Sequence, residues 1–218
     1  MLMEIKADAK AIFKKRLNKF LGIVEGGELI HIHDPGRLQK ILYEGNEVLL
    51  KRAYGKRKTK WDLIAGRYKG KWVFANSFFH SKIALEMIKS GELFKANEIE
   101  KEKKYGKSRI DFLLDKKILM EVKGCTLEEN GKALFPDAPT LRGQRHITEL
   151  MNALKDGYEA ILLILIFVPS LCFKPNEKVD RKFSELFYNA IDEGMRVYPA
   201  LMEYDGEWVR YKKLLPLC

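Results

Sequence analysis

A nine-residue apolar run constrains the fold of this chain more than any other segment. Residues 160–168 read AILLILIFV and include no polar or charged side chain. The run is far shorter than the roughly 20 apolar residues that a helix needs to cross a bilayer. A short, continuously apolar segment is typical of a strand that is buried on both faces. The sequence therefore predicts a central buried strand here, and no membrane segment.

Helices and further strands are predicted on both sides of this run, from the spacing of apolar residues. The predicted helices cover residues from about 76 to Gly91, from about Thr140 to Asp156, and roughly 179–193. A strand at 195–202 leads into a hairpin that turns at Asp205 and Gly206. Residues 124–140 are expected to be irregular. The order αββαβαβ predicts an α/β (α+β) domain on a mixed sheet over residues 76–218.

Residues 1–75 are expected to form a separate β-rich domain. Strands are predicted at 10–17 and 19–25, with a hairpin turn at Gly26 and Gly27. A short helix is predicted to begin at Asp34 and Pro35, and three more strands follow it. About six short strands and one helix in 75 residues favour a small β-barrel of the oligonucleotide-binding (OB) kind.

Positive charge is concentrated in the first third of the chain. Residues 1–75 hold 17 Lys or Arg and 8 Asp or Glu, whereas residues 76–218 hold 23 and 22. A positive field on a small domain points to a polyanion, most often nucleic acid. The alternative is a solubility charge or the lysine bias of a thermophile, but that bias raises Lys and Glu together. The first third lacks the matching acids.

Residues 51–61, KRAYGKRKTKW, form the strongest basic segment. It places Tyr54 and Trp61 among six cations. Proteins that bind single strands combine cations for the phosphates with aromatic rings for the bases. The alternative is a flexible basic loop whose rings pack on the barrel. The predicted nucleic-acid contacts of this segment are Arg52, Lys56, Arg57, Lys58, Lys60 and Trp61.

Two acidic residues occur in a predicted hairpin at 108–124, SRIDFLLDKKILMEVKG. If its turn centres on Lys116, Leu114 faces Ile118 and Asp111 falls opposite Glu121. Their Cβ atoms would then lie roughly 5 Å apart, which is unfavourable for like charges unless a cation lies between them. Mg²⁺ favours one or two carboxylates, and Lys123 could steady the attacking water or the phosphate charge. The alternative is a solvated acidic hairpin, but the strands are apolar enough to be buried.

Taken together, the motifs resemble those of the sugar fermentation stimulation protein family. The matching segments extend over nearly the whole chain and are residues 33–38 (HDPGRL), 109–112 (RIDF), 121–123 (EVK), 126–127 (TL), 135–140 (FPDAPT), 142–143 (RG) and 145–146 (RH). The resemblance implies an OB-like barrel, a C-terminal domain similar to PD-(D/E)xK nucleases, and a DNA-binding role.

In that superfamily the Asp and the Glu bind Mg²⁺, or Mn²⁺, and the Lys orients the attacking water. Asp111, Glu121 and Lys123 match these positions. The superfamily's helix Glu corresponds to Glu86, which is otherwise a solvated helix residue. Ile110 stands where many members of the superfamily have Pro, a residue that carries no chemistry.

The predicted helix after Thr140 adds further candidates. Arg142, Arg145, His146 and Glu149 share the side opposite its apolar stripe. They could contact phosphates near the metal, or Gln144 and His146 could complete the site; the alternative is an ordinary charged helix face. Arg37 joins Arg142, Arg145 and His146 as a predicted nucleic-acid contact. His31 and His33 could bind a metal, although a surface pair beside a turn is favoured.

These observations favour a DNA-binding protein with a Mg²⁺-dependent nuclease site. The alternative is a non-catalytic DNA-binding regulator of sugar metabolism genes. RNA as the partner, the preferred strandedness and a homodimer all stay open. Cys125, Cys172 and Cys218 are odd in number and widely spaced, which predicts a reducing compartment and no disulfide framework. Because the first residues lack the apolar core of a signal peptide, a cytoplasmic location is expected.

Overall fold

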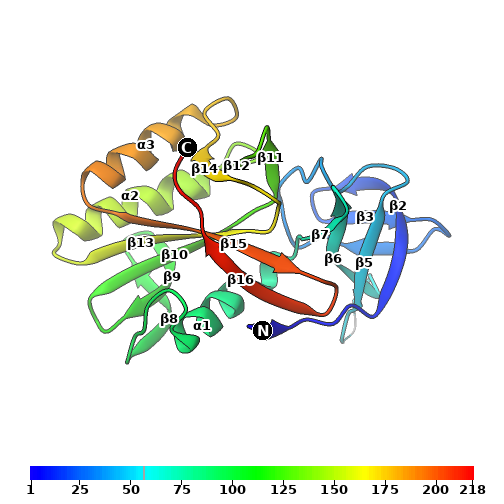
Figure 1. Cartoon of the computed structure of the whole chain (residues 1–218), viewed down its shortest axis with the longest axis horizontal. Helices are drawn as coiled ribbons and strands as arrows, with labels where there is room; N and C mark the ends of the chain where they lie inside the picture. Colours follow the sequence, from blue (N-terminus) through cyan, green and yellow to red (C-terminus); the bar gives the residue numbers. More distant parts are fainter. Residues whose placement is uncertain (56) are drawn as a thin grey trace.

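A six-stranded unit with a closed barrel forms the first part of the computed structural model, which describes residues 1–55 and 57–218. Its strands are β2 (Ala9–Asn18), β3 (Leu21–Val24), β4 (Leu29–His31), β5 (Glu47–Arg52), β6 (Trp61–Tyr68) and β7 (Lys71–Phe74). They pair in the order β4-β3-β2-β5-β6-β7, and β4 also pairs in parallel with β6, opposite Trp61 and Asp62. That last pairing closes β2–β6 into the predicted small barrel, at the blue end of the molecule in Figure 1.

The predicted short helix at Asp34 and Pro35 is wrong. Residues 32–46 form an irregular loop in which Leu38 has a left-handed φ of 55°. Asp34 Oδ1 accepts a hydrogen bond from Gly36 N at 2.9 Å, so the residue makes a local turn and does not cap a helix. The Arg16 guanidinium donates to the carbonyl oxygens of Asp34 (3.1 Å) and Arg37 (3.0 Å) and holds this loop against the barrel.

The second part of the chain is an α/β domain on a mixed sheet. Its principal strands are β8 (Ile99–Tyr105), β9 (Ser108–Leu114), β10 (Ile118–Cys125), β13 (Glu159–Ile166), β15 (Arg196–Tyr204) and β16 (Trp208–Leu214). β13 lies between β10 and β15, parallel to both, and all its residues after Glu159 are buried. The prediction of a central buried strand is confirmed.

Helices lie on both faces of this sheet. Figure 1 shows α2 (Leu141–Lys155) and α3 (Arg181–Asp192) on one side and α1 (His80–Ser90) on the other. α1 follows the 3₁₀ helix η1 (Ser77–Phe79) and ends at Gly91, which has a φ of 70°. The Thr140 side chain caps α2 by accepting from Gly143 N at 2.9 Å. All three predicted helices are confirmed.

The sequence predicts that residues 124–140 are irregular, and this prediction is wrong for part of the segment. They contain β11 (Leu127–Glu129) and β12 (Lys132–Phe135), which form a small second sheet with β14 (Cys172–Pro175). The predicted element order also lacked β8, whose sequence IEKEKKY is almost entirely charged. Such a strand has little apolar signal because it lies at the edge of the sheet.

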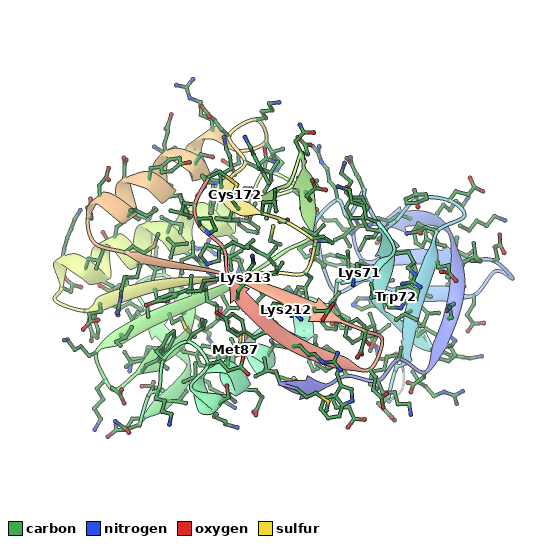
Figure 2. All side chains as sticks on the ribbon, in the orientation of Figure 1. Lys71, Trp72, Met87, Cys172, Lys212 and Lys213 are labelled. Carbon is green, nitrogen blue, oxygen red and sulfur yellow. A yellow bond between two sulfur atoms is a disulfide. The ribbon has the colours of Figure 1, made fainter. Side chains whose placement is uncertain are left out.

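The cysteines were predicted to form no disulfide framework, and the structure corrects this with one disulfide bond. Cys172 at the start of β14 is bonded to Cys218, with the two Cα atoms 5.2 Å apart (Figure 2). The backbone of the last residues pairs with the same strand, because Phe173 N donates to Pro216 O and Cys218 N donates to Phe173 O, each at 2.9 Å. Folding brings together two cysteines that are 46 residues apart in sequence.

The two parts share one continuous sheet of 13 strands. β1 (Met3–Glu4) precedes the barrel strands in the chain and pairs with β16. Trp72 of β7 pairs with Tyr204 of β15. Glu203 on β15 pairs with Lys71 (3.5 Å) and with Lys212 (3.4 Å), both of which are labelled in Figure 2. The division at residues 75 and 76 stays a prediction, although the first strand packs on the second domain.

Asp34→Asn should stabilise the protein at pH 8 and change little at pH 4. Burial, with the nearby charge of Asp137, raises the pKa of Asp34 from 3.8 to about 6. Because the folded-state pKa is raised, the folded protein binds the extra proton between these values, and stability falls as pH rises through them. We expect the melting temperature at pH 8 to rise by about 2–6 °C. Thermal unfolding in chelator at both pH values measures this effect.

The control for this substitution is Glu28→Gln, which removes an exposed acid of the barrel. It should leave the melting temperature unchanged at both pH values. An equal gain for Asp34→Asn at pH 4 and pH 8 would show that its charge is not the cause.

Candidate active site

A cleft of about 710 Å³ lies between the barrel and the α/β domain. One wall is the loop at 34–36, and the other includes the loop at 135–140 before α2. Asp111, Glu121 and Lys123 all line it. The structure therefore brings the three predicted residues into one cavity, with the basic barrel beside them.

The hairpin has the register predicted from its turn. Leu114 pairs with Ile118 and Phe112 with Met120, so Asp111 and Glu121 come next on the two strands. Ladder pairing ends at that point, because Val122 N donates to the Asp111 side chain, to Oδ2 at 2.8 Å. Asp111 Oδ1 accepts from Ser81 Oγ of α1 at 2.9 Å. These two contacts fix the orientation of the Asp111 carboxylate.

Glu121 is held through only one of its oxygens. Its Oε1 contacts both Lys123 Nζ and His146 Nδ1, and these two nitrogens lie 3.2 Å apart. Its Oε2 is buried and has no hydrogen-bond partner among residues 1–55 and 57–218. The residue is 2% exposed. A buried polar atom without a partner is costly, and this one belongs to a carboxylate that lines a cleft.

The pKa values of Asp111 and Glu121 are shifted in opposite directions. Burial, reinforced by the charge of Glu121, raises the pKa of Asp111. Burial also acts to raise the pKa of Glu121, but Lys123 and His146 outweigh it and leave this pKa below its ordinary value. Pairs of carboxyl groups whose pKa values are shifted apart by their surroundings are typical of functional sites.

The residues present fit a divalent cation that keeps part of its water shell. Two carboxylates and one unpartnered Glu121 oxygen supply the hard oxygen ligands that Mg²⁺ prefers. No group of three or more His, Cys, Asp or Glu side chains converges as a metal cage within the part of the chain that the structure describes.

Glu86 lies outside this arrangement, contrary to what the family resemblance implied. Its side chain is 39% exposed on α1, where it pairs with Lys89 at 2.9 Å. The α1 side chain that reaches the acids is Ser81. Ser81 carried no sequence signal, because serine at the start of a helix is usually a structural residue.

The α2 residues divide into two groups that the sequence had placed on one face. His146 is 2% exposed and contacts Glu121, and Arg142 lies beside it with its Nε 3.4 Å from His146 Nε2. Arg145 is exposed on the helix. Glu149 is buried and accepts from Lys107 N at 2.9 Å, so it has a structural role. This side of α2 is therefore not an ordinary solvated face.

Gln144 does not complete the site. Its Nε2 donates to Asp180 Oδ1 at 2.9 Å, and Asp180 caps α3. His80 was not predicted, yet it lines the cleft with its Nε2 unpartnered by any described residue. Burial lowers the pKa of His80 to about 4, so the ring is neutral at pH 7. Gly124 permits this packing, because an added Cβ would collide with the His80 ring.

The predicted basic contacts on the barrel have mixed environments. Arg57 forms a bidentate pair with Asp62 at 2.8 and 3.1 Å, which neutralises part of its charge. Arg52 lies over the Trp61 ring, 5.4 Å from the ring centroid. The remaining residues are Lys58, Lys60 and Arg37, which are exposed, and Lys56, which lies outside the described residues.

The fold and the cleft define a class of two-domain proteins in which an OB barrel precedes an α/β domain. A family model described as the SfsA N-terminal OB domain matches residues 15–75. A second one, the sugar fermentation stimulation protein RE domain, matches residues 75–208. The chain belongs to the sugar fermentation stimulation protein family, which confirms the family and the fold predicted from the motifs.

Relatives match over the full length of the chain. The sugar fermentation stimulation protein homolog of Thermotoga neapolitana is 48% identical over 100% of this chain and 99% of its own. The homolog of Methanococcoides burtonii is 45% identical over 100% and 95%. The solved structure of Pyrococcus furiosus SfsA in complex with Ca²⁺ is 30% identical and covers 99% of this chain and 98% of its own, with a TM-score of 0.92.

No helix among residues 1–55 and 57–218 combines the length and the apolar character needed to span a bilayer.

Proposed function

We propose that this protein binds DNA and hydrolyses its phosphodiester bonds with a divalent cation held by Asp111 and Glu121. The observation that carries the proposal is the unpartnered, buried Oε2 of Glu121 in the cleft that Asp111 also lines. The Ca²⁺ complex of the Pyrococcus furiosus relative supports it, since Ca²⁺ and Mg²⁺ both choose oxygen ligands. When bound, the cation would stabilise charge on the phosphoryl oxygens and lower the pKa of a bound water.

The surrounding residues prepare the two carboxylates for this task. Ser81 Oγ and Val122 N each donate to one oxygen of Asp111, which fixes its plane. His146 and Lys123 contact Oε1 of Glu121 and leave Oε2 for the cation. The Lys123 side chain is 14% exposed, so its ammonium group faces little water. There it would orient the attacking water and offset the developing phosphate charge.

The barrel supplies the support for a nucleic acid. Residues 1–75 carry nearly all the net positive charge, and this barrel forms one wall of the cleft. OB barrels commonly bind oligonucleotides, so the fold and the charge favour the same partner. A DNA-binding regulator without turnover would use the same barrel and would leave the DNA uncut.

A cleavage assay with single-stranded and double-stranded DNA tests the proposal. We expect cleavage with Mg²⁺ or Mn²⁺, none in chelator, and a rate at least about 100-fold lower for Asp111→Asn. Glu86→Gln is the matched control, because it removes a carboxylate of α1 that pairs with Lys89 and does not line the cleft. Its rate should stay within about twofold of the wild-type rate.

Two results would contradict hydrolysis at this site. Cleavage that survives Asp111→Asn would come from another site or from a contaminating enzyme. Salt-dependent DNA binding without any turnover would instead support the regulator.

A further inference from the structure

A row of aromatic rings runs over the barrel surface to the edge of the cleft. Phe20 follows β2 and stacks on His31 of β4, with centroids 6.4 Å apart and an angle of 19° between the planes. His31 packs edge-on against His33 at 4.4 Å, and His33 lies 5.7 Å from Phe78 of η1. These four rings, the aromatic row, come from three separate segments of the chain.

The two ends of the aromatic row are open to solvent. Phe20 is 49% exposed and Phe78 is 58% exposed. Single exposed apolar side chains are normal on protein surfaces. Here, however, a series of ring contacts joins the two exposed rings, and Phe78 also packs edge-on against Phe79, with centroids 5.3 Å apart, so the fold fixes their order. Ser77 Oγ, for example, donates to His33 O at 2.8 Å and ties η1 to the barrel.

Cations accompany the aromatic row. Lys82 is exposed, and its Nζ lies 4.0 Å from the centroid of the Phe78 ring. Lys19 precedes Phe20 and is also exposed. Asp62 lies 3.3 Å from His33 Nε2, but its charge is already paired with Arg57. The row therefore offers π-faces beside positive charge.

The aromatic row is continuous with the candidate active site. Lys19, next to Phe20, and Ser77, next to Phe78, both line the cleft that contains Asp111 and Glu121. A polymer lying on the rings would thus enter the cleft without crossing a bare surface. This continuity is what distinguishes the row from a patch that would suit a second copy of the chain.

We propose that the aromatic row of Phe20, His31, His33 and Phe78 is a stacking surface for the bases of single-stranded nucleic acid. Single strands expose the faces of their bases, which stack on protein rings while cations bind the phosphates. Bases within an intact duplex are already stacked on each other and offer no free face to these rings. The substrate class would then be single-stranded DNA or an unpaired DNA end. This inference rests on the proposed function.

Binding measured in chelator tests this assignment without any cleavage. Fluorescence anisotropy of the full chain compares a labelled mixed-sequence single strand, an abasic strand of equal length and the matched duplex. The abasic strand keeps the phosphates and lacks the bases. We expect the base-bearing strand to bind at least about 5-fold more tightly than the abasic strand, since one stacked base contributes about 1 kcal/mol or more.

Leucine variants then locate the effect. Phe20→Leu and Phe78→Leu keep an apolar side chain and remove the ring, so each should weaken single-strand binding about 5-fold or more. The abasic strand and the salt dependence of binding should be unaffected, because the phosphate contacts remain. Tyr188→Leu is the matched control: this ring is 46% exposed on α3, away from the cleft lining, and its loss should change nothing. Circular dichroism and thermal unfolding confirm that each variant is folded.

Equal binding of abasic and base-bearing strands would overturn the proposal, as would leucine variants that bind like the wild type. A wild-type dimer that the leucine variants convert to monomer in sedimentation would also overturn it, because the row would then be an interface between copies. The cleavage assay tests the proposed function independently of this binding assay. Base-dependent binding without cleavage leaves this inference standing, whereas cleavage of duplex without base-dependent binding leaves only the proposed function.

Discussion

Glu121→Gln should lower metal-dependent cleavage by about 1,000-fold, which corresponds to roughly 4 kcal/mol of transition-state stabilisation. The amide keeps the size of the side chain and one acceptor oxygen, so His146 and Lys123 retain a partner. With that oxygen on the side of His146 and Lys123, the NH2 group takes the place of the unpartnered Oε2 and presents a donor to the cation. Isothermal titration with Mn²⁺ should show weaker binding, and the cleavage rate should fall with it.

The matched control for this substitution is Glu128→Gln. Glu128 is as deeply buried, at 1% exposure, but its oxygens are satisfied by Tyr68 OH (2.8 Å), Lys69 Nζ (2.7 Å) and Gly131 N. Its loss should reduce thermal stability and leave metal binding intact. An equal loss of metal affinity in both variants would contradict this prediction. The cause would then be the loss of any buried negative charge and not the loss of the unpartnered Glu121 oxygen.

Lys123→Met should reduce the cleavage rate by at least about 100-fold, while the protein still binds DNA. Methionine has a similar length and no charge, so the cleft keeps its shape and loses the ammonium group beside Glu121. Without that charge, less opposes the burial that acts to raise the pKa of Glu121. Single-turnover kinetics at saturating DNA measure the rate, and anisotropy in chelator measures the binding.

Lys103→Met serves as the control for the loss of a positive charge. Lys103 lies on β8 and pairs with Glu100 at 3.0 Å. Its removal should change the rate by no more than about twofold. A Lys123→Met protein with the wild-type rate would remove Lys123 from the chemistry, even if the carboxylates proved essential.

Much of the fold could be predicted because its elements are defined by local patterns. The apolar run at 160–168 is long enough for one strand and became β13. Thr140 and Gly91 delimit α2 and α1 through a cap and a left-handed turn, both of which have a clear signature in sequence. The turn length alone placed Leu114 opposite Ile118, because a β-strand has a side-chain period of two.

Other elements carried weak or misleading local signals. β8 is nearly all charged, and β11 has three residues, so neither shows the apolar alternation by which strands are recognised. The Asp34-Pro35 pair is compatible with the start of a helix and with a tight turn. The structure has the turn, in which Arg16 contacts the loop. Cys172 and Cys218 meet only because β14 and the last residues lie side by side.

Local sequence patterns are enough to specify the core of the candidate site. Asp111, Glu121 and Lys123 belong to one hairpin, so strand periodicity and one turn are enough to place them together. Their surroundings depend on tertiary packing, because the contacts around them join segments far apart in the chain. Ser81 contacts Asp111 across 30 residues and His146 contacts Glu121 across 25, while Glu86 is left on the outer surface of α1. The unpartnered oxygen of Glu121 and the aromatic row arise in the same way, from packing between elements that no local pattern records.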